Sequence, residues 1–166
     1  LLPAVTMGAI AWVGWRDAWG AAEREMSRSA EAVGEYALRV LEAQRLAIDA
    51  ANDLLRGLSD AEVRAREAEL HAALRARLPR MPLVQTIYVL DRDGRALVSG
   101  HLHPVPRSAS FADREWMGSL AAPDAPPFHV SRVFVEKPEQ NVFFGASARR
   151  EGTGNGLPEN AFDGVV

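Results

Sequence analysis

A long stretch without proline constrains the fold of this chain more than any other feature. No proline occurs between Pro3 and Pro79, and proline is the residue that most strongly interrupts a helix. Within this stretch, small and apolar residues recur in alternating steps of four and three, as on a helix face that packs against another helix. The row consists of Met26, Ala30, Val33, Ala37, Val40, Gln44, Ala47, Ala51, Leu54 and Leu58. We therefore predict a long helix over residues 23–58.

A second row widens this apolar stripe, because Leu41, Ile48 and Leu55 lie beside the first row on a helix. The stripe can pack on the rest of its own domain, or it can pair with the same helix of a second copy. The two interpretations are compatible, since a wide stripe offers room for both contacts. We expect a homodimer in which this helix is the contact.

A second helix is predicted over residues 59–78. Ser59 and Glu62 match the capping box, in which each side chain accepts a hydrogen bond from a backbone N–H at the start of a helix. Pro79 and Pro82 end the helical part of the chain.

The strongest strand signal lies at residues 86–99. Its first half is β-branched, aromatic and aliphatic, and Asp93-Gly94 is a tight-turn signal, because glycine adopts positive φ without strain. Asp91 and Asp93 also resemble the opening of a calcium loop, but the further ligands are missing, so a hairpin turn is the better interpretation. The other predicted elements are strands at residues 129–135, 142–149 and 161–166 and a short helix at residues 113–117.

Composition excludes several classes of function. The chain has 166 residues, of which 48% are hydrophobic and 25% charged, enough to build a core. Its net charge of −3 argues against nucleic acid as a partner, because nucleic acids are bound by broad basic surfaces. The absence of cysteine excludes disulfides and thiolate metal sites. His101 and His103 form a pair without a third ligand, and no nucleophile–base constellation is present, so we expect no enzyme activity, metal or cofactor here.

The N-terminal residues suggest a membrane. Residues 1–15 carry no charge, and Trp12, Trp15 and Trp19 cluster where charged residues begin. Tryptophan favours the boundary between membrane and water. We therefore predict that residues 1–15 are part of a transmembrane helix in a bacterial inner membrane, with residues from Arg16 onward in the periplasm. The alternatives are a buried helix with three core tryptophans and, less well matched, a cleavable signal peptide.

A small-molecule site is predicted around Asp113, Arg114 and Trp116. Arginine offers a two-pronged donor for a carboxylate or phosphate, and tryptophan offers a flat apolar wall. In the simpler structural interpretation, Asp113 caps a helix, Arg114 pairs with it, and Trp116 fills the core. Arg132 and Phe143 come from the two following strands and are candidate neighbours.

The order of these elements resembles the double Cache sensor domain, a PAS-like module of bacterial histidine kinases, diguanylate cyclases and chemoreceptors. The resemblance lies in "VLDRDGRALVSG", followed by "FADREWM", two strands, a glycine-rich turn and "FDGVV". It implies an α+β fold in which the long N-terminal helix packs on a five-stranded antiparallel sheet. It also implies that Arg114 and Trp116 hold a ligand carboxylate, with Asp163 as the acid nearest to the expected amine site.

The function implied by this resemblance is small-molecule sensing outside the cytoplasm by a membrane-bound signal-transduction receptor, most plausibly a histidine kinase. The ligand is unknown, and an anion is expected from Arg114. The alternatives are the sensor region of a diguanylate cyclase or chemoreceptor, or a ligand-free dimerisation module. We divide the chain into a partial transmembrane helix at 1–15, two helices at 16–80 and a sensor module at 81–166, which we expect to continue past Val166.

Overall fold

The computed structural model describes residues 2–108, 110–136, 141–158 and 161–166. The chain divides into two units, Leu1–Val40 and Leu41–Val166. Helix α1 (Leu2–Leu55) runs through the first unit and into the second. The predicted long helix is therefore confirmed, and it begins earlier in the chain than the heptad row indicates.

The first unit consists of α1 alone. Trp12, Trp15 and Trp19 are all exposed, so they are not core residues. Among the described residues, no helix is both long enough and apolar enough to cross a membrane. The predicted inner-membrane anchor is therefore wrong. Arg16 and Asp17 follow the uncharged residues directly, and their charge lowers the hydropathy of any stretch of α1 that is long enough to span a membrane and includes them.

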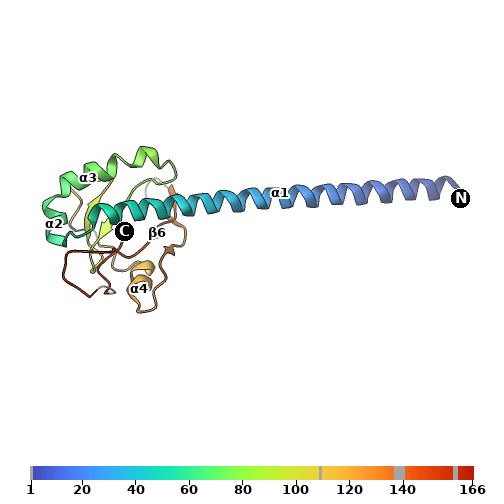
Figure 1. Ribbon diagram of the computed structural model, residues 1–166. Helices are drawn as coiled ribbons and strands as arrows, with labels where there is room; N and C mark the ends of the chain where they lie inside the picture. The colour runs from blue at the N-terminus through green and yellow to red at the C-terminus, as the bar shows by residue number, and fades with distance from the viewer. Residues whose placement is uncertain (1, 109, 137–140, 159–160) are drawn as a thin grey trace. The chain divides into compact units, whose positions relative to one another are not determined.

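The second unit has its main core where the end of α1 and two short helices, α2 (Asp60–Ala65) and α3 (Glu67–Arg75), pack with the hairpin at residues 88–99. Figure 1 shows α2 and α3 beside each other, with α4 (Glu115–Ala121) apart from them. The second predicted helix is interrupted at Arg66, whose backbone (φ −103°, ψ 21°) is not helical, and a short 3-10 helix, η1 (Leu78–Arg80), follows it. The buried core residues on these helices are Ala47, Ile48, Ala51, Leu55, Val63, Leu70 and Leu74.

The predicted capping box is confirmed at the start of α2. Glu62 Oε2 accepts hydrogen bonds from the Ser59 hydroxyl at 2.6 Å and from the Ser59 backbone N–H at 2.8 Å. These bonds favour the ionised carboxylate and lower the pKa of Glu62, the bond from the Ser59 hydroxyl having the larger effect.

The lowered pKa of Glu62 makes the stability of the second unit depend on pH. The ionised carboxylate stabilises the fold above the unfolded pKa of about 4.3, and this contribution is lost as pH falls through the lower folded pKa. We expect Glu62→Gln to give a shallower fall in stability below that pH. Urea unfolding from pH 6 to pH 3 measures it. Glu69, whose pKa is lowered by Arg66, is unchanged in the variant. Part of the dependence of stability on pH therefore remains. An unchanged pH profile would contradict the expectation.

The predicted hairpin is confirmed as strands β1 (Tyr88–Leu90) and β2 (Ala96–Ser99), which pair antiparallel. Gly94 has φ +75°, as its turn position requires. The Asp91 carboxylate accepts hydrogen bonds from the backbone N–H groups of Asp93 and Arg95, at 3.0 Å and 2.9 Å. The Asp91 carboxylate therefore stabilises the turn.

The prediction of a five-stranded sheet is wrong. Within the described residues, the strands form three separate two-stranded antiparallel sheets. Val165 makes only single bridges, to Leu90 and to Arg149. Besides β1 and β2, the strands are β3 (His129–Val130) paired with β6 (Ala146–Ser147), and β4 (Phe134–Glu136) paired with β5 (Asn141–Phe143).

Two local features account for this difference. The predicted strand at 142–149 is divided at Phe144 and Gly145, so that its two halves, β5 and β6, pair with different partners. The predicted last strand is interrupted at Gly164, whose φ of +116° lies outside the range of a β-strand.

A second core cluster lies between β1, β2 and α4. Its buried members are Leu90, Ala96, Val105, Met117, Leu120 and Val165, with Tyr88, Phe111, Trp116 and Phe162 packed against them. The sheets are small, and side chains from the helices supply a large part of the core.

Candidate functional site

The predicted ligand group lies at the start of α4. Arg114 is the N-cap residue of this helix, and both Arg114 and Asp113 are exposed. Trp116 is half-buried, and its ring centre lies 6.3 Å from that of Phe111 at the second core cluster. Trp116 therefore contributes to the core, as the simpler interpretation of this cluster expected. Its contact with a ligand stays a prediction.

Two other residues of the predicted site, Arg132 between β3 and β4 and Phe143 in β5, are placed differently from one another. Arg132 lies next to α4, because its backbone N–H donates to Glu115 Oε1 at 2.9 Å. Its guanidinium Nε lies 3.4 Å from Glu115 Oε2, but the Arg132 side chain is 92% exposed, so this ion pair contributes little. Phe143 pairs with Phe134 through the backbone of β5 and β4. The Phe143 side chain lies outside the part of the chain that the structure describes.

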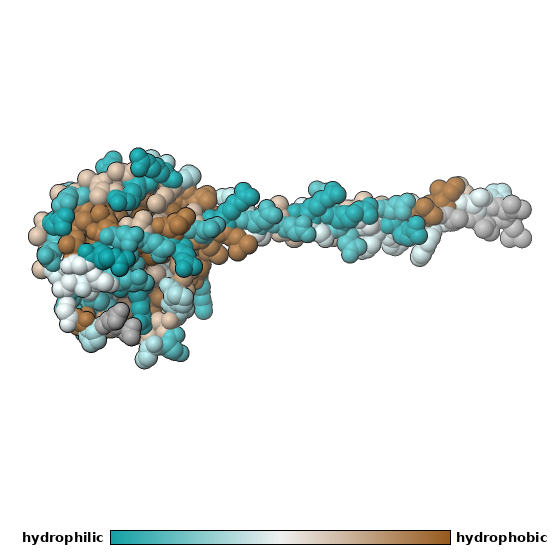
Figure 2. Space-filling view, in the orientation of Figure 1, coloured by the Kyte–Doolittle hydropathy of each residue, from teal (hydrophilic) through white to brown (hydrophobic). Residues whose placement is uncertain are grey.

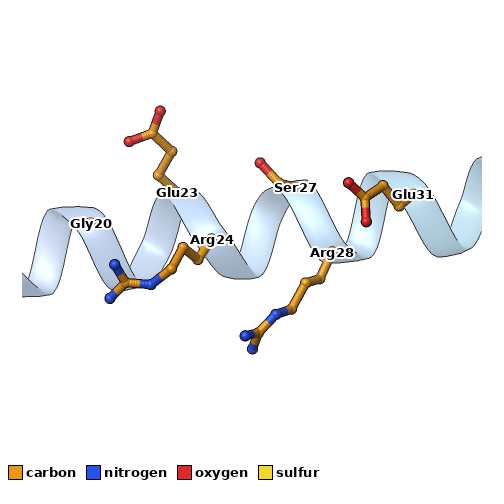
Figure 3. Close-up of a pocket in the computed structure, with 6 residues that line it drawn as sticks. All are labelled: Gly20, Glu23, Arg24, Ser27, Arg28 and Glu31. Carbon is orange, nitrogen blue, oxygen red and sulfur yellow. The ribbon is translucent and has the colours of Figure 1, made fainter.

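Two hollows on the described surface lie on α1 and do not border Arg114 or Trp116. In Figure 3 the side chains of the first extend outward from a single helix, with no facing wall. A single helix cannot enclose a ligand, so these hollows are not binding cavities. The first is lined by Gly20, Glu23, Arg24, Ser27, Arg28 and Glu31, and the second by Trp12, Trp15, Arg16 and Trp19.

A buried polar cluster in the second unit has more features of a site. The Arg150 side chain is 1% exposed, and its Nη1 donates to Asp60 Oδ1 at 2.7 Å and to the backbone carbonyl of Asp163 at 3.2 Å. Asn155 Nδ2 donates to both acids, at 3.0 Å to Asp60 and 2.7 Å to Asp163. The Thr153 hydroxyl also donates to Asp163. We call these five residues the Arg150 cluster.

One edge of the Arg150 guanidinium has no partner among the described residues. Nε and Nη2 are both buried and form no hydrogen bond. These two nitrogens lie on the same side of the planar group, where their N–H bonds point in nearly the same direction and can bind two oxygens at once. A buried donor without a partner costs about 1–3 kcal/mol, so this edge is an unusual feature for a residue that serves packing alone.

The Arg150 cluster is joined directly to the end of α1. The backbone N–H of Gly57 donates to the Gly152 carbonyl at 2.6 Å, and that of Gly154 donates to the Leu58 carbonyl at 3.0 Å. A Cβ on Gly154 would lie 2.4 Å from the Gly57 carbonyl oxygen, so only glycine permits this approach. Asn52 on α1 also donates to one backbone group of the loop and accepts from another. A change in the loop would therefore act directly on the last turn of α1.

Sequence reasoning found one member of this cluster and missed its centre. Asp163 was predicted as a ligand residue, but it lies with Asn155 and Thr153 rather than with α4. Arg150 gave no signal, because it is one of many arginines and its ion-pair partner Asp60 is 90 residues away in the chain. The unusual glycine content of residues 151–157 was the only local sign of a close backbone approach here.

Comparisons with protein families, with curated proteins and with solved structures found no match for this chain.

Proposed function

We propose that this chain is a small-molecule sensing module of a signal-transduction protein, and that the Arg150 cluster is its ligand site. The observation that carries the proposal is the buried, unpartnered Nε/Nη2 edge of Arg150. The position of the cluster at the end of α1 supports a signalling role, because the helix that contacts the site continues through the other unit of the chain.

The chemistry of the free edge indicates the ligand class. Two parallel N–H donors match the two oxygens of a carboxylate, and such charge-assisted pairs are shorter and stronger than neutral hydrogen bonds. Asp60 already pairs with Nη1, and Asp163 lies beside it, so the cluster carries one more acid than base. Affinity would therefore come from the matched geometry of the two hydrogen bonds rather than from net positive charge.

A ligand at this edge could signal only if it binds two arrangements of the loop with different affinity. The hydrogen bonds of Gly57 and Asn52 to the loop offer such a mechanism. A bound carboxylate would hold the Arg150 side chain in one position, and with it the loop that is hydrogen-bonded to the end of α1. After release of the carboxylate, the Arg150 side chain and the loop would be less restrained.

The first test is binding of small carboxylates, each compared with its primary amide, which keeps the size of the ligand but offers only one oxygen. We expect a carboxylate to raise the melting temperature and the amide to do so much less. One hydrogen bond to a charged group contributes about 1.5–3 kcal/mol, so Arg150→Lys, which keeps the charge but loses one of the two parallel donors, should weaken binding roughly 10- to 150-fold in calorimetry.

Arg114→Ala is the matched control, because it removes the arginine of the site predicted at α4. If Arg114→Ala weakens binding and Arg150→Lys does not, the ligand lies at α4 and the Arg150 cluster is structural. If no carboxylate in the panel binds the wild-type protein, the free edge holds an ordered water, and the sensing role at this cluster is wrong.

A further inference from the structure

We propose that one face of α1 pairs with the same face of a second copy of this chain, in parallel and in register. With the exceptions of Gly20 and Val40, every residue of the unit Leu1–Val40 whose burial is described is exposed. Large apolar residues are among them. This inference stands apart from the ligand site, because it concerns the unit formed by α1 alone.

The contact face contains a row of large apolar residues that recur every seven positions. Between Trp12 and Val33, these residues are between 67% and 70% exposed. Residues seven apart fall on nearly the same line of a helix, so the row forms one continuous seam. The row consists of Trp12, Trp19, Met26, Val33 and Val40, and the positions between its members are Arg16, Glu23, Ala30 and Ala37. We call these nine residues the α1 seam.

Apart from Arg16 and Glu23, which belong to the α1 seam, the charged residues of this part of α1 lie away from the seam. The positions that flank the seam between residues 20 and 36 are small or uncharged, and the other charged residues lie on the remaining faces of the helix. In Figure 3, Arg24 and Arg28 extend toward the opposite edge of the helix from Glu23 and Ser27. Much of the surface of α1 in Figure 2 is hydrophilic, which fits an outer face that stays in water. The flanking residues are Gly20, Ala22, Ser27, Ser29, Gly34 and Tyr36.

The outer charges need no counter-charge from a partner. Arg39 and Glu35 form an ion pair within the same helix, at 3.8 Å, and acids and bases are interspersed along this side. A partner for the seam must therefore offer a mainly apolar, helical surface. The α1 seam of another copy has this composition except at Arg16 and Glu23, and an in-register parallel pair places each apolar residue opposite its own copy.

The continuation of the same row supports helix packing as its purpose. Beyond Val40, the row passes through Ala47 and Ala51, which are buried against the second unit of their own chain. Isolated helices in water are marginal, and most helical stability in proteins comes from packing of an apolar face. The exposed apolar residues between residues 12 and 40 have no such packing within their unit. A second copy would bury them, as the core of the second unit buries Ala47 and Ala51.

The pairing has a built-in weakness at Arg16 and Glu23. In a parallel, in-register dimer each of these residues faces the same charge on its partner, which is unfavourable. Association is therefore expected to be weak, and Glu23→Leu should strengthen it. Sedimentation equilibrium of the ligand-free chain would measure both effects, with an expected tightening of about tenfold or more for one removed like-charge contact.

Single introduced cysteines test both the face and the orientation, because the chain has no cysteine of its own. We expect Ala30→Cys, on the seam, to form a disulfide-linked dimer under mild oxidation ~10-fold or more faster than Glu35→Cys, on the outer face, since paired helices raise the effective concentration of facing thiols. Val33→Glu, added to Ala30→Cys, should abolish the difference. Its unfolding curve would show that the second unit remains folded.

Two results would overturn the inference. Equal oxidation rates for Ala30→Cys and Glu35→Cys, or a monomer at every concentration that sedimentation can measure, would show that the seam has no second copy as its partner. Cross-linking only between two different positions, such as cysteines at residues 19 and 33 mixed in one sample, would indicate an antiparallel pair and would refute the parallel arrangement.

Discussion

Gly164→Ala is expected to destabilise the second unit by about 3 kcal/mol or more. Gly164 has φ +116°, which a residue with a Cβ adopts at a cost of about 1–3 kcal/mol. A Cβ at this position would also lie 2.1 Å from the backbone carbonyl oxygen of Leu90. Neither atom can move freely, because the adjacent Val165 exchanges two backbone hydrogen bonds with Leu90, at 2.8 Å and 3.2 Å. Relief of the clash would therefore require separation of the C-terminal segment from β1.

Gly156 and Gly118 provide controls for this expectation. Gly156 also has positive φ (+73°), but a Cβ there would meet no atom within 4 Å, so Gly156→Ala should cost only about 1–2 kcal/mol. Gly118 is inside α4 in open space, and Gly118→Ala should stabilise by about 0.5–1 kcal/mol. Urea denaturation of the three variants measures the order. If Gly164→Ala costs no more than Gly156→Ala, the contact between the C-terminal segment and β1 is wrong.

The elements that were predictable from the sequence are those whose signals are local. The capping box depends on Ser59 and Glu62, which are three residues apart, and the hairpin depends on Gly94 between two apolar runs. The heptad row likewise predicted α1, because helical periodicity needs no information from the rest of the chain. Each of these features follows from residues that meet within a few positions of each other.

The arrangement of the sheets was not predictable in the same way. An apolar run at residues 142–149 indicates a strand, but not that it will divide at Phe144 and Gly145 and pair with two different partners. The conformation of Gly164 is set by its close approach to the backbone of Leu90 and Asp91, which lie far away in the sequence. Strand pairing depends on such distant contacts, and the five-stranded sheet was implied by the resemblance to the double Cache domain rather than by the pattern of residues.

The candidate site shows the same limit. Arg114 and Trp116 stood out because they are close together in the sequence, yet Trp116 contributes to the core and Arg114 is exposed at a helix end. Arg150 did not stand out, because burial distinguishes it from the other arginines of the chain, and burial is a property of the fold. Its partners come from α2 and from the loop before Gly164, and no spacing rule connects these segments.

Asp60→Ala is expected to destabilise the second unit by about 3–5 kcal/mol. Removal of one partner from a buried ion pair leaves the other charge without compensation, which is far more costly than the loss of a surface pair. Arg150 is nearly fully buried, and Asp60 is the acid to which its Nη1 donates at 2.7 Å. Two nitrogens of Arg150, Nε and Nη2, already lack partners among the described residues. The substitution therefore leaves a buried guanidinium with only the Asp163 carbonyl among its described acceptors.

A double-mutant cycle separates this ion pair from the other contacts of Asp60. Because Arg150→Met removes the buried charge, Asp60→Ala should cost much less in the Arg150→Met background than in the wild type, with a difference of about 2–3 kcal/mol. Asp60→Asn keeps an oxygen acceptor without the charge and should fall between wild type and Asp60→Ala. Denaturant unfolding of the four proteins measures the coupling. Equal costs of Asp60→Ala in both backgrounds would show that Asp60 acts through the start of α2 and Asn155, and that Arg150 does not depend on it.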